Sequence, residues 1–325
     1  MASPSSAVTR PDLRAAVYQE WDAAGERAGF IADRVLPIID VPYPSASYKM
    51  IPREEYIKDV DTLRKGSGHY TESTFSFSES YYRTQDYGTA ERIDANAQAT
   101  LAEFFDAEMA ATAMVLSRLL RDQEKKAAAL LFSATTFSGK TAAIGGANWA
   151  THATAVPIND ILTARVAVRD QCGIWPNSLV LSNKVWLHLI ACDQIIDRLG
   201  YGGSVNEARI ATKAVVAQLL DLRQIIVGDA IKDTAKEGHD MSASAIWNED
   251  AALVALINPA PRMQAPTLGM TWHWPGDGSE AQFHIEKYWD EDSRSFKIRG
   301  RRQTGQEVRD AAFGYYLTTV LTKGA

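Results

Sequence analysis

The sequence predicts an α+β fold, because predicted helices dominate its first two thirds and predicted strands the remainder. The stretch from Arg92 to Phe132, about forty residues, contains neither proline nor glycine, so it predicts one helix of roughly 60 Å at about 1.5 Å per residue. Two extended, aromatic-rich segments precede this stretch. From Gln224 onward the pattern turns to short strands with little strict βα alternation, which favours α+β over α/β.

The composition is that of a globular protein. The 325 residues are 46% hydrophobic and 23% charged, and this length fits two domains or one large one. A net charge of -6 argues against a chain dedicated to nucleic acid, although it leaves a locally basic face open. The two cysteines, Cys172 and Cys192, form no C-x-x-C pattern, which favours a reduced protein. No apolar run approaches the ~20 residues of a membrane span, so we expect a soluble, intracellular chain.

The first part of the chain predicts a helix, an extended arm and a long hairpin. Asp12 can cap a helix over residues 13–24, after which prolines 37, 42, 44 and 52 favour an extended arm. Residues 47–57 are strand-like, and Phe75, Phe77 and Tyr81 recur at even spacing in a second strand. The charged segment 58–68 between them cannot bury itself, so we expect its tip to be solvated or to rest on another molecule.

The predicted long helix has a broad apolar stripe and a charged far end. Leu116, Leu119 and Leu120 recur at helical spacing, and Arg118 and Arg121 lie among them. One interpretation is a core helix of a large α/β enzyme. We favour a spine that holds outward-reaching segments in contact with other copies of the chain.

The rest of the chain predicts shorter elements. Helices are expected over 159–171, 183–191, 193–198 and 206–220, and strands over 178–181, 225–227, 245–247, 253–257, 270–274, 282–289, 296–302 and 307–321.

The sequence contains no convincing catalytic, cofactor or metal motif. The segment from Ser138 to Thr141 resembles the end of a phosphate-binding loop, but it lacks the earlier glycine and follows a helix instead of a strand. The six histidines show no H-E-x-x-H pattern, so each is interpreted as a surface or core residue. Ser182 lies near His188 and Asp193, yet capping of the next helix is its simpler role. We therefore predict no enzyme, no cofactor and no metal.

A basic cluster lies near the end of the chain, at Arg294, Lys297, Arg299, Arg301, Arg302 and Arg309. Strand alternation predicts residues 297, 299 and 301 on one face. A DNA-binding surface is one interpretation. We favour salt bridges within or between subunits, with acidic partners such as Asp290, Glu291 and Asp292.

Three groups of residues, in this order, resemble the major capsid proteins of tailed bacteriophages. Residues 30–37, followed by extended prolines and Tyr48, resemble the N-terminal arm of that family. Residues 176–182 and 193–197 resemble the strand and helix that open its axial domain. Residues 225–230, 237–238 and 246–247 resemble its later strands.

The resemblance implies the Hong Kong 97-type capsid fold, with an N-terminal arm, an extended β-hairpin loop, a long spine helix in a peripheral domain, and an axial domain. On that plan the arm spans 1–44, the extended loop 45–90, the peripheral domain 91–155, the axial domain 156–300, and a C-terminal strand returning to the peripheral domain 301–325. Certain family members form a lysine–asparagine isopeptide bond. Lys58 and Lys65 lie on the corresponding loop, but no motif identifies their partners, so we expect non-covalent assembly.

The implied function is structural: hexamers and pentamers of the chain assemble into an icosahedral shell around phage DNA. Implied partners are the chain itself, scaffold, portal and decoration proteins, and DNA held by non-specific contact, with no membrane. The implied location is the virion, after synthesis in the host cytoplasm. The expected assembly residues are Lys58, Asp59, Asp61, Arg64, Lys65, Phe75, Phe77, Tyr81, Arg118, Arg121, Arg299, Arg301 and Arg302.

Two alternatives stay open. An encapsulin-like nanocompartment shares the fold but encloses cargo enzymes, and the long arm favours the phage protein over it. A soluble α/β enzyme is the third interpretation, and activity that depends on Ser182 or His188 would support it.

Overall fold

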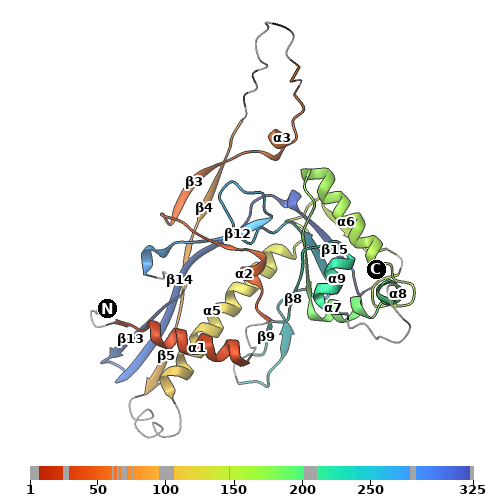
Figure 1. Cartoon of the computed structure of the whole chain (residues 1–325). Helices are drawn as coiled ribbons and strands as arrows, with labels where there is room; N and C mark the ends of the chain where they lie inside the picture. Colours follow the sequence, from red (N-terminus) through yellow and green to blue (C-terminus); the bar gives the residue numbers. More distant parts are fainter. Residues whose placement is uncertain are drawn as a thin grey trace.

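Two β-sheets covered by helices, together with a projecting hairpin, make up the protein (Figure 1). The computed structural model describes residues 7–24, 29–60, 62–63, 66, 72, 74, 76–94, 106–145, 147–200, 211–236, 238–278 and 283–322. The mixture of sheets and helices confirms the predicted α+β class.

The larger sheet joins segments from both ends of the chain. It has six strands in the order β1-β13-β14-β12-β2, and β5 also pairs with β14. The long strand β14 is its centre, because it pairs with β13, β12 and β5 along different parts of its length. The strands are β1 (Val8–Thr9), β2 (Ile38–Asp40), β5 (Gln85–Asp94), β12 (Gly269–His273), β13 (His284–Asp290) and β14 (Ser295–Val308).

Helix α5 (Ala107–Leu131) packs across this sheet, beside α1 (Pro11–Ala24). The α5 stripe predicted from the leucine spacing is buried against Ile285 and Ile298. The approach is close at Gly300, where a Cβ atom would lie 2.6 Å from Val115 Cγ1. A side chain at this position would therefore push the helix away from the sheet.

The long helix is shorter than the sequence predicts. Residues Arg92 to Asp94 end strand β5, residues 95–105 lie outside the described part, and α5 begins at Ala107. Its 25 residues span about 37 Å. The absence of proline and glycine permits a helix, but β5 pairs with β14 along its whole length, so its backbone contributes to the sheet instead.

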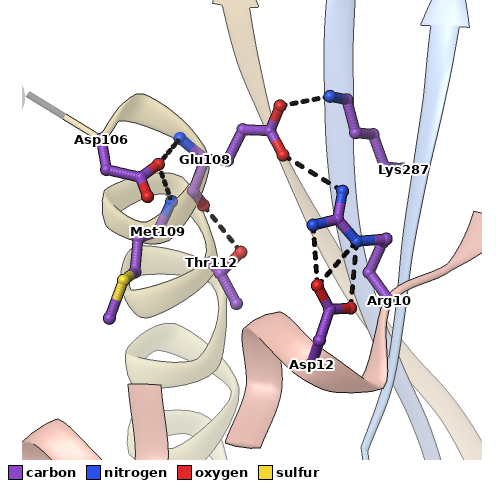
Figure 2. Close-up of polar contacts among 7 residues, drawn as sticks. All are labelled: Arg10, Asp12, Asp106, Glu108, Met109, Thr112 and Lys287. Carbon is purple, nitrogen blue, oxygen red and sulfur yellow. Dashed lines mark hydrogen bonds and ion pairs between the residues drawn. The ribbon is translucent and has the colours of Figure 1, made fainter. Parts of the chain in front are cut away.

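Polar contacts fasten the start of α5 to neighbouring elements (Figure 2). Asp106 caps the helix by accepting hydrogen bonds from the backbone N–H groups of Glu108 and Met109, both at 3.1 Å. The Glu108 carboxylate accepts from Arg10 Nη1 at 3.3 Å and pairs with Lys287 Nζ. The helix start is thereby joined to the segment before α1 and to β13.

The second sheet has five strands in the order β6-β15-β11-β7-β8 and is buried on both faces. Along β7, Leu179 and Leu181 pack against the helices of one face, whereas Val180 packs in the core that holds the end of α5. The strands are β6 (Thr141–Ala143), β7 (Ser178–Ser182), β8 (Gln224–Gly228), β11 (Ala251–Ala255) and β15 (Gly314–Thr318). The helices are α6 (Pro157–Cys172), α7 (Asn183–Ile190), α8 (Asp193–Gly200) and α9 (Lys213–Leu219).

Sheet membership does not follow the continuous ranges that the sequence suggested. Strands β12 to β14 lie in the six-stranded sheet with α5, although 156–300 was assigned to the axial domain. Within 301–325, the end of β14 lies in the six-stranded sheet, whereas the last strand, β15, pairs with β11 and β6 in the five-stranded sheet. Tyr316 and Leu317 explain this placement, because they enter opposite cores and so suit a strand covered on both faces.

The hairpin and several short elements complete the fold. Strand β3 (Ser45–Met50) pairs with β4 (Ser78–Arg83), which agrees with the predicted hairpin. The first predicted strand is shorter than expected, because Pro52 precedes a helical turn, α3 (Arg53–Tyr56). The predicted extended arm likewise contains a helical turn. The remaining short elements are α2 (Ala32–Val35), β9 (Ile231–Asp233), β10 (Ala243–Ala245), and the 3-10 turns η2 (Pro275–Asp277) and η3 (Ala311–Phe313).

A buried carboxylate on α5 links the arm to the five-stranded sheet. Glu124 is 2% exposed, and its oxygens accept from the Ala32 backbone N–H at 2.5 Å and from Trp247 Nε1 at 2.7 Å. Ala32 begins α2, so Glu124 satisfies a free N–H group at that helix start. Burial raises the pKa of Glu124 to about 7, because it disfavours the charged form.

Replacing Leu116 with Asp should unfold the subunit. Leu116 is fully buried against the sheet, and a charge there would lack a partner, at a cost of about 4 kcal/mol or more. Met114 on the same helix is 55% exposed, so Met114→Asp is the matched control and should leave the fold intact. Urea unfolding followed by circular dichroism measures both, and equal stability of the two variants would contradict the packing of α5.

The contribution of Glu124 to stability should fall as pH rises from about 5 to about 8. The folded state holds the proton up to about pH 7, whereas the unfolded carboxyl loses it near 4.5, so folding binds a proton between these values. The free energy of unfolding, relative to the non-titrating Glu124→Gln variant, should therefore drop by roughly 3 kcal/mol across that window. Urea titrations at several pH values test this, and parallel pH profiles of the two proteins would refute it.

Candidate assembly surfaces

The base of the hairpin is fixed by an aromatic cluster that the sequence did not reveal. Ring centroids of Tyr48 and Tyr82 lie 5.1 and 4.7 Å from that of Trp272 on β12. Trp272 Nε1 donates to Glu307 Oε2 at 2.8 Å, and burial raises the pKa of Glu307. Trp272 lies about two hundred residues after these two tyrosines in the sequence, so no local pattern links them.

A polar contact holds the segment between β3 and the hairpin tip against the body. Arg53 Nη1 lies 3.2 Å from Asp310 Oδ1, just after β14. A cavity of about 230 Å³ lies beside this pair and is lined also by Lys140 and Arg309. The hairpin is therefore anchored by packing at its base and by an ion pair further along.

Beyond this anchor most of the described hairpin residues are exposed, and they include both charged and apolar side chains. Lys58 and Asp59 are exposed, and so are Phe77 and Tyr81, at 49% and 69%. Lys58 Nζ lies 3.6 Å from Glu55 Oε2. The other predicted hairpin residues, Asp61, Arg64, Lys65 and Phe75, lie outside the described part of the chain.

The exposed side of α5 carries the predicted basic residues. Arg118 pairs with Glu91 on β5, and its side chain is 55% exposed. Arg121 is exposed and lines a hollow of about 500 Å³ with Lys125 and the apolar side chains of Ile231 and Met241. The latter two are 49% and 66% exposed, so this surface combines positive charge with apolar area.

Basic residues of β14 occupy one face of the six-stranded sheet, as alternation predicts. Arg299 pairs with Glu286 of β13, and Arg301 Nη2 lies 3.4 Å from the same carboxylate. Lys297 Nζ lies 2.5 Å from Asp290 Oδ2. Burial acts to raise the pKa of Glu286, but the Arg299 hydrogen bond and the nearby positive charges lower it. The predicted salt bridges within the subunit are thus confirmed for these residues.

Arg302 differs from its neighbours, and its prediction as a surface contact is wrong for the single subunit. It is 1% exposed, its guanidinium lies 4.6 Å from the Phe283 ring centroid, and Nη1 donates to Gln123 on α5. The burial of Arg302 follows from the alternation of side chains along a strand, because the even-numbered residues of β14 face α5. Burial lowers the pKa of this guanidinium.

The residues considered for catalysis have structural roles. Ser182 Oγ caps α7 by accepting from the Val185 backbone N–H at 3.4 Å, as expected. His188 Nδ1 instead faces His152 Nε2 at 3.0 Å. Cys172 and Cys192 are buried free thiols, and burial raises the pKa of Cys192 to about 11, which leaves it protonated at neutral pH.

The described residues contain neither a membrane-spanning helix nor a cluster of metal ligands. No described helix combines the length and apolar character that crossing a membrane requires. Within the same residues, no group of three or more His, Cys, Asp or Glu side chains is placed to hold a metal ion.

Comparisons with known proteins relate this geometry to viral capsids. No protein-family model matches the chain. A major capsid protein of Pseudomonas phage JBD67 is 22% identical over 245 residues, which cover 75% of this chain and 77% of that protein. A phage-related protein from Bordetella bronchiseptica RB50 has a similar structure, with a TM-score of 0.69, 18% identity, and coverage of 97% of this chain and 99% of that one. The capsid structure of cyanophage P-SCSP1u is also similar, with a TM-score of 0.55, 13% identity, and coverage of 87% of this chain and 86% of that one.

The chain has the fold of tailed-phage capsid proteins, the Hong Kong 97-type fold, and the resemblance found in the sequence is confirmed. Among these similar proteins, the Pseudomonas phage protein is named a major capsid protein and the cyanophage chain comes from a capsid structure.

Replacing Trp272 with Ala should loosen the hairpin base and destabilise the subunit by about 3–5 kcal/mol, because a buried ring that contacts two tyrosines is lost. Tyr81→Ala is the control. Tyr81 is exposed on the neighbouring position of β4, so its loss should change stability by about 0.5 kcal/mol or less. Chemical denaturation compares the variants, and a small effect of Trp272→Ala would contradict this anchor.

Proposed function

We propose that this protein is a tailed-phage major capsid protein, which assembles as hexamers and pentamers into an icosahedral shell enclosing phage DNA. The observation that carries the proposal is the capsid fold over nearly the whole chain, together with a major capsid protein among its relatives. The anchored hairpin with exposed apolar residues supports it, because such a segment gains its burial from another molecule.

We infer that the chain divides as capsid subunits of this fold do, with the arm over 1–44, the extended loop over 45–90 and the spine within 91–155. The β3–β4 pairing and the position of α5 support these ranges. The axial domain proposed for 156–300 is centred on the five-stranded sheet. Because β14 pairs with β5, and β12 and β13 both pair with β14, we assign these three strands to the peripheral domain, and we assign β15 to the axial one.

Contacts between subunits are proposed at the hairpin and at the basic side of α5. Phe77 and Tyr81 supply apolar area on the hairpin, and Lys58 adds charge. Arg118 and Arg121 supply charge on the helix. The hairpin of one subunit and the basic side of α5 of the next are different surfaces. A contact between them would be heterologous, and repeated contacts of this kind would generate rings of subunits. Many modest contacts of this kind sum to a stable shell.

The outer face of β14 is proposed as a secondary contact. Arg299 and Arg301 lie on one face of β14 beside the Glu286 carboxylate, and we propose that a neighbouring acidic group or packaged DNA approaches this face. Contact with DNA would be non-specific. We further propose synthesis in the host cytoplasm, residence in the virion, and scaffold, portal and decoration proteins as partners.

Deleting residues 58–68, with a short glycine-serine link in their place, should leave the subunit folded and abolish shells. The anchor at Trp272 and at Arg53–Asp310 lies outside the deletion, whereas the exposed end of the hairpin is removed. Circular dichroism checks the fold, and sedimentation with electron microscopy detects rings and shells in both proteins.

Unchanged assembly of the deleted protein would overturn the proposed role of the hairpin. A wild-type chain that stays monomeric at high concentration, with and without a scaffold protein, would overturn the capsid proposal itself. Nucleic acid in shells from infected cells, as opposed to enzyme cargo, separates a phage capsid from a nanocompartment.

A further inference from the structure

Two histidines from separate elements meet at the edge of the five-stranded sheet unit. His152 lies in the turn before α6, and His188 lies on α7. His152 Nε2 is 3.0 Å from His188 Nδ1, and the ring centroids are 5.2 Å apart. Both side chains are partly exposed, so solvent reaches the pair.

The backbone holds both residues in place. The Asp193 backbone N–H donates to the His152 carbonyl at 3.1 Å, which fixes the turn against the start of α8. Ser182 caps the helix that carries His188. The backbone therefore holds the two imidazoles in fixed positions, which lowers the conformational entropy lost when an ion binds between them.

The separation of the two nitrogens matches that of two ligands on one metal ion. Two bonds of about 2.1 Å at a right angle place their nitrogens about 3.0 Å apart, whereas a tetrahedral angle gives about 3.4 Å. The observed 3.0 Å is close to the right-angle value. Octahedral or square-planar ions with a preference for imidazole, such as Ni²⁺ and Cu²⁺, fit better than tetrahedral Zn²⁺.

Both rings are suited to supply lone pairs. A hydrogen bond between two imidazoles requires a bare nitrogen on one and an N–H on the other. The donor ring releases the proton on its facing nitrogen and takes one up on its far nitrogen, so no net proton is lost. Rotation about the broad χ2 torsion then turns both lone pairs toward one point.

The charges around the pair permit a cation. Lys184, one turn before His188, has its ammonium 3.4 Å from Glu249 Oε2, which offsets its charge. Asp193 begins α8 next to the His152 carbonyl and adds negative charge nearby. No third ligand side chain is in place among the described residues, so water would complete the coordination.

We propose that His152 and His188 form a two-histidine site for a first-row divalent transition metal with right-angle ligand positions, and that Ni²⁺ and Cu²⁺ are the best-fitting ions. Binding would join the turn at 151–154 to α7. The site lies apart from the hairpin and from the basic side of α5, so it is independent of the proposed assembly role.

Isothermal titration of the tag-free, unassembled subunit with Ni²⁺ at pH 7.5 tests the site. Wild type should bind one ion, and His188→Gln should weaken binding by about tenfold or more, since even the loss of an outer partner of a metal ligand costs 10–100-fold. His239→Gln is the matched control, because His239 is exposed and remote in sequence, and it should bind as wild type does.

Thermal unfolding with Ni²⁺ or Mg²⁺ gives a second measurement. Ni²⁺ should raise the midpoint of wild type and of His239→Gln but not of His188→Gln, and Mg²⁺ should raise none of them. Circular dichroism confirms that each variant is folded. Failure of wild type to bind Ni²⁺, or equal affinity of the His188→Gln variant, would overturn the proposal.

Discussion

The buried carboxylate of Glu124 is the interaction on which the assembly of this subunit's parts depends. It lies on α5, which packs on the six-stranded sheet. It accepts hydrogen bonds from the start of α2 and from the Trp247 indole, which is buried in the core that α2 and the end of α5 share with the five-stranded sheet. A buried acid without these two donors would be costly, so the arm, the helix and the second sheet must come together in one arrangement. The adjacent Gln123 extends the same network to Arg302 on β14.

This rigid centre explains how the hairpin can extend away from the body. The aromatic cluster at Trp272 and the Arg53–Asp310 pair fix its direction, and its described residues include the exposed apolar side chains of Phe77 and Tyr81. A shell protein needs both properties. The fixed direction positions the hairpin for contact with a neighbouring subunit, and the exposed apolar side chains become buried in that contact. The charged side of α5 and the outer face of β14 offer further surface to neighbours.

Much of the fold was predictable because its signals are local. The cap at Ser182, the hairpin strands and the one-face placement of Lys297, Arg299 and Arg301 follow from short-range spacing, and the structure agrees. The limits of α5 and the burial of Arg302 differ from the prediction. Each is decided by a partner distant in sequence, and neither periodicity nor composition contains that information.

The sequence by itself determined the fold class, the outward hairpin, the absence of a recognisable catalytic motif and the resemblance to phage capsid proteins, because these depend on local patterns and their order along the chain. Only the tertiary structure decided that residues 92–94 belong to a sheet, that Trp272 anchors the hairpin, and that His152 meets His188. These contacts join residues from separate elements. Their formation depends on how the two sheets and α5 pack, which is settled by burial of the whole core.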